Sequence, residues 1–255
     1  NLIIEIKNKV EDLVKNYYQN VELKYLIDTN MTLITKDFIQ SFPNLTITTT
    51  VTSKGDHDKL RDNSYDKVIS KLKEVKTCFE NKNYILQIRY NVNHENCVDF
   101  ESTIDYLERI GLIFKVEVQN IYNSDNSFYE NQLTENEFED FYINEVVPFL
   151  IRHNRKVKIL PSYGLSRQCR VQSVYDRKIY SNGQIVLCDS FPKKDNFNEF
   201  VCPLEHIEKM CLECYDFPYC GGHKPCDAIR CNGKYRRKKI EINRIKKYVE
   251  INNID

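Results

Sequence analysis

Eight of the ten cysteines in this 255-residue chain fall between residues 169 and 231. Five of them follow one another closely, with two, five, five and four residues between neighbours: Cys211, Cys214, Cys220, Cys226 and Cys231. Thiolates are the preferred ligands of both iron-sulfur clusters and structural zinc, and eight cysteines suffice for two sites. The spacing therefore predicts two metal centres in a reducing, cytoplasmic compartment. It does not distinguish iron-sulfur clusters from zinc. Cys78 and Cys97 lie apart, and we expect them to be plain thiols.

The first two cysteines of this group flank a predicted β-hairpin. Thirteen residues separate Cys169 from Gly183, and four separate Gly183 from Cys188. Asn182-Gly183 suits a type I′ turn between strands expected at residues 174–180 and 184–187. The hairpin returns Cys169 and Cys188 to the same end of the ribbon, so both thiolates can face one metal centre.

The remainder of the chain alternates strand and helix patterns up to about residue 155. Runs with period-two alternation or many β-branched residues predict strands at 21–27, 45–51, 84–92 and 114–118. Apolar residues at helical spacing predict helices at 5–18, 35–42, 65–75, 100–110 and 136–151. This order predicts an α/β fold with a parallel sheet, either a partial (β/α) barrel or a doubly wound sheet. The pattern changes near Leu160, and a basic amphipathic helix at 235–251 carries Ile242, Ile245 and Val249 on one face.

The strand at residues 84–92 carries a second group of candidate functional residues. Strict alternation places Arg89 and Asn91 on one face, while Leu86, Ile88 and Tyr90 take the other. Polar side chains near the carboxyl end of a barrel strand normally contact a ligand, so this pair is a candidate binding site. A salt-bridged pair within the core is the alternative.

These motifs together resemble radical S-adenosylmethionine (SAM) enzymes with a C-terminal SPASM, or twitch, extension. The run Cys169-x13-Gly183-x4-Cys188, a gap, then Cys211-x2-Cys214-x5-Cys220 is similar to the SPASM cysteine pattern. Residues 28–35 resemble the family's TNGTLLT segment with Met31 in place of Gly, residues 57–61 its HDxxR loop, and residues 88–92 its IRxNV strand. The resemblance covers nearly the whole chain. It loosens after Cys220, where five residues precede the next cysteine instead of the family's three.

The resemblance implies a fold and a set of metal ligands. Residues 1–160 would form the C-terminal part of a radical SAM partial (β/α) barrel, 161–234 a cysteine-rich α+β SPASM domain, and 235–255 a terminal helix. Two auxiliary four-iron, four-sulfur clusters would be held, one by Cys169, Cys188 and Cys226, the other by Cys211, Cys214, Cys220 and Cys231. The first lacks an obvious fourth ligand, which Cys202 or a substrate thiolate would supply.

The resemblance also implies a function, namely a radical SAM maturase that crosslinks or oxidises a ribosomally made peptide, with flavodoxin or ferredoxin as electron donor. Asn30, Arg89 and Asn91 would line the S-adenosylmethionine pocket. Asp189 matches the position of the catalytic base in sulfatase-type maturases, although an Asp there can also cap the turn. The family's CxxxCxxC motif and its GGEP strand are absent from this sequence. We therefore expect that the radical-generating cluster lies upstream of residue 1 or has been lost.

Composition excludes two other classes of partner. Lysine and arginine number 37 and aspartate and glutamate also 37, so no net charge attracts the chain to nucleic acid or to a membrane surface. No apolar run approaches the roughly 18 residues that a membrane span requires. Two alternatives to the peptide maturase remain, a sulfatase-type formylglycine maturase and a non-catalytic zinc or iron-sulfur module that binds a partner protein.

Overall fold

The computed structural model describes residues 2–18, 21–121, 130–157, 178–179, 185–186 and 236–252. The chain divides into two compact units, the first comprising Asn1–Tyr122 and Tyr129–Phe138, the second Asn123–Phe128 and Glu139–Asp255. The predicted boundary near Leu160 falls outside the described residues and stays a prediction. Each unit is described by itself.

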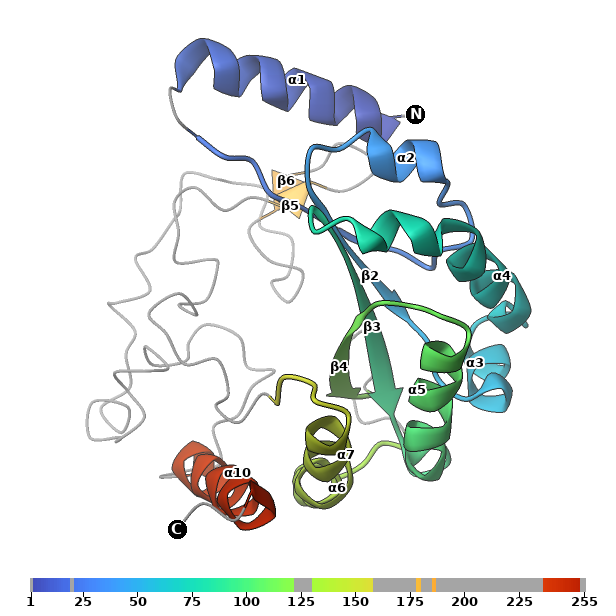
Figure 1. Ribbon diagram of the computed structural model, residues 1–255, viewed down its shortest axis with the longest axis vertical. Helices are drawn as coiled ribbons and strands as arrows, with labels where there is room; N and C mark the ends of the chain where they lie inside the picture. The colour runs from blue at the N-terminus through green and yellow to red at the C-terminus, as the bar shows by residue number, and fades with distance from the viewer. Residues whose placement is uncertain are drawn as a thin grey trace. The chain divides into compact units, whose positions relative to one another are not determined.

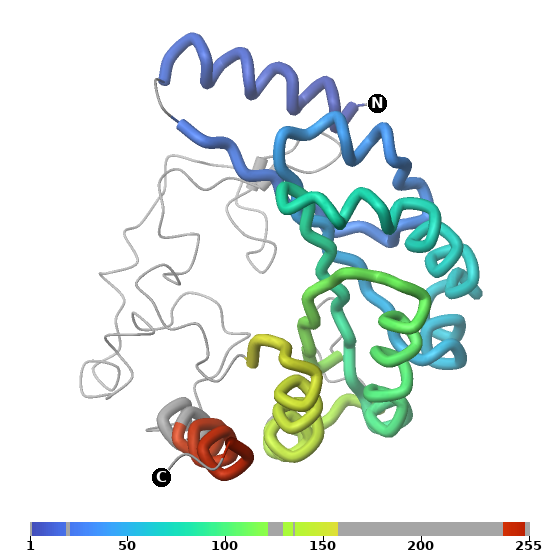
Figure 2. Tube along the Cα trace, viewed as in Figure 1, coloured from blue at the N-terminus to red at the C-terminus, as the bar shows by residue number. Residues whose placement is uncertain are grey.

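A four-stranded, fully parallel sheet forms the centre of the first unit (Figure 1). Its order follows the chain: β1 (Tyr25–Asp28), β2 (Leu45–Thr50), β3 (Tyr84–Val92) and β4 (Lys115–Asn120). Helices alternate with these strands, as the tube trace shows from blue to green (Figure 2). The predicted α/β class with a parallel sheet is confirmed. Four strands in an open order do not by themselves establish a barrel.

Helices cover one side of this sheet. α2 (Lys36–Gln40), α3 (Lys54–Leu60), α4 (Tyr65–Val75) and α5 (Phe100–Arg109) all lie on the same side in Figure 1. On β3 the residues that face them are buried: Leu86, Ile88, Tyr90 and Val92. α4 and α5 contribute the matching apolar faces, because their buried residues recur at helical spacing: Val68, Ile69, Leu72, Val75, Phe100, Ile104 and Leu107. The face of residues 84–92 that was predicted to carry Leu86, Ile88 and Tyr90 is therefore the helix-packed core.

The segment between β1 and α2 contains a strained residue. Met31 has φ +67°, in the left-handed region that favours glycine, and its side chain is fully buried at 0% exposure. This is the position at which Met replaces the Gly of the resembled TNGTLLT segment. Thr35 then caps α2 as predicted, its Oγ1 accepting a hydrogen bond from Phe38 N at 3.2 Å. Packing of a large apolar side chain offsets the backbone strain.

Two predicted elements differ in the structure. β1 begins at Tyr25, because the side chain of Asn44 bonds the preceding backbone, accepting from Tyr25 N at 3.4 Å and donating to Leu23 O at 2.7 Å. Residues 57–61, predicted to form a loop, lie mostly within helix α3. The buried residues of α3 are Asp56 and His57, which are polar. Apolar periodicity therefore gave no sign of this helix.

The first helix, α1 (Leu2–Tyr17), has no fully buried residue. A polar contact joins it to β1, since Tyr25 Oη donates to Glu11 Oε1 at 2.9 Å, and within the helix Glu11 also pairs with Lys7 at 2.9 Å. An apolar stripe remains exposed on it: Ile3, Ile6, Val10, Leu13 and Tyr17.

One helical run was predicted at residues 136–151, which begins in the first unit and continues into the second. The structure has α6 (Glu135–Phe141), a π-helical turn at Tyr142–Val146 labelled η3, and α7 (Val147–Arg152). The C-terminal helix, α10 (Arg236–Asn252), matches its prediction, yet Ile242, Ile245 and Val249 are each close to 40% exposed. α10 buries Arg244 instead, whose guanidinium bonds both oxygens of Glu139 at 3.0 and 2.7 Å and covers the Tyr142 ring at 4.1 Å.

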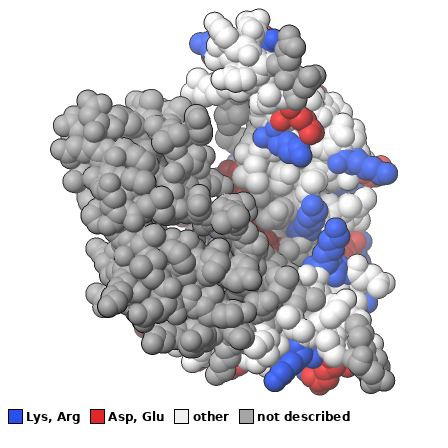
Figure 3. Space-filling view, turned by 90° about the vertical axis from the view of Figure 1, so that its left-hand side faces the viewer, with Lys and Arg blue, Asp and Glu red and all other residues white. Residues whose placement is uncertain are grey.

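The predicted hairpin is present as a short antiparallel pair, β5 (Lys178–Ile179) with β6 (Ile185–Val186). Its turn and the flanking cysteines lie outside the described residues. Within the described part of the chain, no helix is both long and apolar enough to span a bilayer. Over the described residues of the face drawn in Figure 3, basic and acidic side chains are interspersed, in keeping with equal numbers of the two charges.

Candidate functional site

A polar face covers the side of the sheet opposite the helices. Paired residues in parallel strands point to the same side, so the register places Thr50, Arg89 and Glu117 in one row and Asn91 with Gln119 in the next. We call this the polar face and define it by six side chains: Asp28, Gln87, Arg89, Asn91, Glu117 and Gln119. The predicted placement of Arg89 and Asn91 on one face of β3 is thus confirmed.

Glu117 connects three members of the polar face. Its carboxylate accepts hydrogen bonds from Gln87 Nε2 at 2.7 Å and from Arg89 Nε at 3.0 Å on β3, and from Gln119 Nε2 at 2.9 Å on its own strand. Burial by itself would raise the pKa of Glu117, but the bonds from Arg89 and Gln87 and the charge of Arg89 hold that pKa below its ordinary value. Glu117 is therefore ionised at neutral pH.

Arg89 lies between two carboxylates. Besides Glu117, its Nη2 lies 3.7 Å from Asp28 Oδ1 at the end of β1. About a quarter of the Arg89 side chain stays exposed, so this side chain is partly accessible from solvent. The polar face therefore offers one cation and two anions on three of the four strands, β1, β3 and β4. Ligands bind at the carboxyl edge of open α/β sheets.

The other two predicted pocket residues are placed differently. Asn91 is half-buried on the polar face, and its backbone carbonyl accepts a hydrogen bond from Asn96 Nδ2 at 3.0 Å. Asn30 is exposed beyond β1, where its Oδ1 accepts from Thr32 N at 3.3 Å and from Thr32 Oγ1 at 2.9 Å. Asn30 therefore stabilises its own turn, and the β1 residue that contacts Arg89 is Asp28.

Sequence reasoning did not single out Asp28, Gln87, Glu117 or Gln119. The alternation of β4 could have indicated Glu117 and Gln119, since both share one face of a strand that otherwise carries Val116 and Val118. Their registry with Arg89 and Asn91 required the tertiary pairing of β3 with β4.

A buried hydrogen-bond network supports the end of β3. Asp56 is 7% exposed and accepts from Asn93 Nδ2 and from Asn96 Nδ2, each at 2.8 Å. The two asparagines also bond each other's backbone N–H groups at 2.9 Å, and Tyr90 Oη donates to Asn96 O at 2.6 Å. A carboxylate on α3 thereby fixes the loop that follows Arg89 and Asn91.

His57, next to Asp56, is 1% exposed. Its Nε2 lies 3.3 Å from Ser64 Oγ, and its Nδ1 has no hydrogen-bond partner among the described residues. Burial lowers the pKa of His57 to about 4, and repulsion from Arg61 acts in the same direction. The imidazole is consequently neutral at pH 7.

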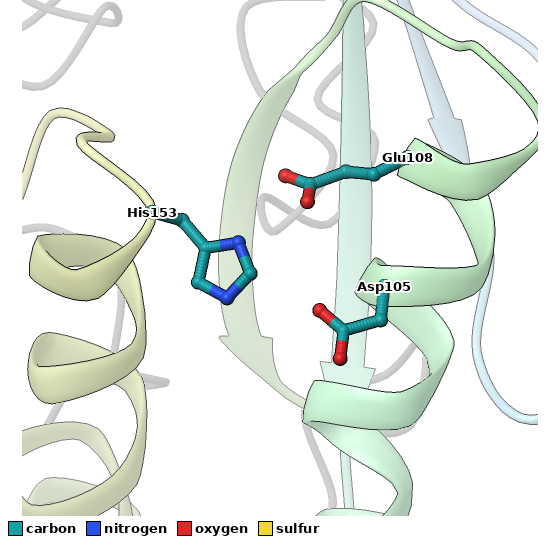
Figure 4. A group of neighbouring side chains, drawn as sticks. All are labelled: Asp105, Glu108 and His153. Atoms are coloured by element: carbon teal, nitrogen blue, oxygen red, sulfur yellow. The ribbon is translucent and has the colours of Figure 1, made fainter.

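Two further acidic residues lie outside the polar face. Asp105 and Glu108 project from the same side of α5, one turn apart (Figure 4). His153, drawn with them, belongs to the second unit and stacks on Phe149 with ring centroids 4.1 Å apart. The predicted base Asp189, the seven predicted cluster cysteines and Cys202 lie outside the described residues. Cys78 is a buried free thiol and Cys97 a partly exposed one.

Comparisons with known proteins give a structural match. No protein-family model matches the chain, and no curated protein does. A solved structure described as tagged anSMEcpe with bound AdoMet, an anaerobic sulfatase-maturating enzyme, is similar with a TM-score of 0.56. The match covers 98% of this chain and 78% of the other, at 15% sequence identity. At this identity the match shows that the two chains share a fold.

Proposed function

We propose that this chain is part of a radical SAM/SPASM maturase that modifies a ribosomally made peptide, using S-adenosylmethionine and auxiliary iron-sulfur clusters. The observation that carries the proposal is the polar face at the carboxyl edge of a sheet whose fold is shared with an AdoMet-bound structure. The cysteine pattern from Cys169 to Cys231 supports it independently. The partners would be the precursor peptide and an electron donor such as flavodoxin or ferredoxin.

The polar face fits the chemistry of S-adenosylmethionine. The methionyl end of that cofactor is a zwitterion, so it needs a cationic and an anionic partner a few ångströms apart. Arg89 would hold its carboxylate, and Asp28 or Glu117 would accept from its ammonium group. The partly exposed Arg89 side chain and the amides of Gln87, Asn91 and Gln119 provide further donors. In this proposal Asn30 orders the turn next to the pocket.

When bound and reductively cleaved, S-adenosylmethionine supplies a 5′-deoxyadenosyl radical that abstracts a hydrogen atom from the peptide. The chain's own residues would position the two reactants. The Asp56 network holds the loop after Asn91 in place, which orients the end of β3 toward the ligand. Hydrogen bonds from Gln87 and Gln119 keep the Glu117 carboxylate ionised and oriented.

The auxiliary clusters would use the thiolates as the resemblance assigns them. One site would take Cys169, Cys188 and Cys226, with Cys202 or a substrate thiolate as the fourth ligand. The other would take Cys211, Cys214, Cys220 and Cys231. The antiparallel pairing of β5 with β6 supports the hairpin on which the first assignment depends. The donor set is all sulfur, as iron-sulfur clusters require.

A second candidate function is a sulfatase-type formylglycine maturase. The role of Asp189 distinguishes it from the peptide maturase. In that enzyme Asp189 would act as a general base, removing the proton of a substrate thiol or hydroxyl as the substrate radical is oxidised. The name of the structurally similar protein favours testing this possibility. Replacing Asp189 with Asn should abolish product formation in that case, while leaving iron content unchanged.

Metal content tests the cluster proposal on this chain alone. Protein purified without oxygen should contain about eight iron and eight sulfide ions, since two four-iron, four-sulfur clusters are expected. Replacing Cys211 and Cys214 with Ser should remove about half of the iron, and replacing Cys78 with Ser is the matched control that should remove none. Colourless protein with about two zinc ions and no sulfide would instead favour a non-catalytic binding module.

Activity requires the radical-generating cluster. A reconstituted enzyme carrying a CxxxCxxC segment should release 5′-deoxyadenosine with reductant and shift the mass of a peptide encoded beside it. Replacing Arg89 with Gln should weaken S-adenosylmethionine binding, roughly tenfold or more for a lost charge-assisted contact. Failure of the full-length enzyme to yield either product would reject the maturase proposal.

A further inference from the structure

β4 is an edge strand of the parallel sheet. In the order β1-β2-β3-β4 it pairs with β3 alone among the strands that the structure describes. Ile121 N donates to Val92 O at 3.1 Å, so the odd-numbered residues of this segment direct their backbone groups toward β3. Successive residues of a strand direct their N–H and C=O groups to opposite sides. Val116, Val118 and Asn120 therefore direct theirs to the outer side of β4.

The outer side of β4 lacks the features that usually protect an edge strand. Such strands are commonly blocked by proline, by bulges or by charged side chains. β4 contains no proline, and its pairing with β3 is continuous from Lys115 to Asn120. Its central charge, Glu117, is held on the polar face by three hydrogen bonds. β4 is therefore able to pair with a further extended chain.

A second observation at the end of this edge indicates a missing donor. Asn120 Nδ2 donates to Leu133 O at 2.7 Å, whereas Asn120 Oδ1 is buried and accepts no hydrogen bond within the described ranges. Buried acceptors are rarely left without a donor. An extended chain along β4 would bring backbone N–H groups to this end of the strand.

We propose that the outer edge of β4 binds the precursor peptide as an additional strand of the sheet. This inference rests on the proposed function, which supplies a peptide as the substrate. Extended peptides add to exposed sheet edges, where main-chain hydrogen bonds give affinity and alternate side chains give specificity. Neighbouring strands lie about 4.8 Å apart, so the peptide lies directly beside Glu117 and Gln119. It thereby borders the polar face, where S-adenosylmethionine binds in the proposed function.

The two faces of β4 determine which peptide sequences fit. Every second side chain of the peptide lies on the polar face, and the residue to be modified belongs to this set because the radical forms there. The side chains between them lie next to Val116 and Val118, which are half-buried and pair with Ile88 and Tyr90 of the helix-packed core. Apolar side chains cover this margin of the core best. The modified residue is therefore preceded and followed directly by apolar residues.

Amide hydrogen exchange, measured by NMR on the whole chain, tests the edge directly. The probe is a synthetic peptide that alternates valine with threonine and has serine at its centre and lysine at both ends. Saturating peptide should slow exchange at Val116 and Val118 about fivefold or more, because each N–H gains a hydrogen bond. Glu117, whose N–H already faces β3, should change less than about twofold. Unchanged exchange at Val116 and Val118, or equal slowing at all three residues, overturns the proposal.

Backbone methylation of the probe distinguishes strand addition from other modes of binding. One peptide is N-methylated at its valines and a second at its threonines and serine. Only one of these two sets of N–H groups faces β4, so one peptide should bind about fivefold or more weakly than the unmethylated probe, and the other within about twofold of it. Equal weakening in both peptides, or none in either, contradicts strand addition.

Two proline variants provide a matched pair on the protein. Val118→Pro removes an N–H that points away from β3, so the sheet keeps its own hydrogen bonds while the peptide loses one. Leu26→Pro is the equivalent change on the outer side of β1, since Thr29 N donates to Thr48 O and Leu26 has the opposite parity. Val118→Pro should weaken probe binding about fivefold or more and Leu26→Pro less than about twofold. Equal effects of the two variants contradict the site.

The edge site and the maturase proposal can fail separately, because the probe needs neither a cluster nor S-adenosylmethionine to bind. A peptide mass shift with no slowing of exchange in β4 would retain the maturase and overturn the edge site. Slowed exchange without any product from the reconstituted full-length enzyme would support the edge and reject the maturase. Slowed exchange at Val116 and Val118 on raising the protein concentration alone would assign the edge to a second copy of this chain and overturn the proposal.

Discussion

Replacing Asp56 with Ala tests whether a buried carboxylate determines the geometry of the polar face. The carboxylate accepts two hydrogen bonds, from Asn93 Nδ2 and Asn96 Nδ2, each 2.8 Å long. Asn96 Nδ2 keeps a second acceptor, the carbonyl of Asn91 at 3.0 Å, whereas no other acceptor of Asn93 Nδ2 is found among the described residues. The substitution therefore leaves one buried amide donor unsatisfied and weakens the support of a second.

The magnitude follows from these contacts. A hydrogen bond to a charged group contributes about 1.5–3 kcal/mol, and two give about 3–6 kcal/mol as an upper range. Removing the carboxylate also removes the free energy that its own burial costs, so we expect a net loss of about 3 kcal/mol. In a chain of this size that loss lowers Tm by about 6–12 °C.

Urea titration followed by circular dichroism measures the change in the free energy of unfolding. Asp66→Ala is the matched control, because the Asp66 side chain is 80% exposed and pairs with Lys54 at the surface; it should cost less than about 1 kcal/mol. A loss below about 1 kcal/mol for Asp56→Ala, or an equal loss in both variants, would refute the reasoning.

Three further predictions concern other parts of the chain. Met31→Gly should be less destabilising than Met31→Ala by about 1 kcal/mol in urea titrations, because only glycine relieves the left-handed backbone at φ +67°. Arg244→Ala should detach α10 and cost about 3–5 kcal/mol, seen as faster hydrogen exchange in α10, whereas the exposed Lys246→Ala should not. The pKa of His57 falls from 6.5 unfolded to about 4 folded, so its stabilising effect is complete above pH 6.5 and decreases toward pH 4. His57→Gln should reduce that pH dependence, and an unchanged slope contradicts it.

Local patterns predicted most elements of the first unit. The helix at Tyr65–Val75 and the strand at Tyr84–Val92 were predicted with the bounds that the structure has. Both have strong apolar periodicity, so their own residues specify the element and the face it buries. α3 was missed for the opposite reason, since its buried residues are Asp56 and His57 and its contacts come from distant loops.

The candidate site was only half predictable. Alternation alone placed Arg89 and Asn91 together on the face of β3 opposite Leu86, Ile88 and Tyr90, and it could have grouped Glu117 with Gln119 on β4 in the same way. It could not reveal that Glu117 and Asp28 flank Arg89, because strand order and register depend on packing between segments far apart in the chain. Asn30 lies near Asp28 in sequence, yet its side chain bonds its own turn.

The sequence by itself determined the α/β class, the order of the strands and of most helices, and the cysteine spacing that indicates metal, because each depends on residue type and local periodicity. The tertiary structure decided which side chains meet on the polar face, that Asp56 supports the loop after β3, and that His57 Nδ1 lacks a hydrogen-bond partner among the described residues. Those properties depend on long-range contacts and on burial, which no local pattern specifies.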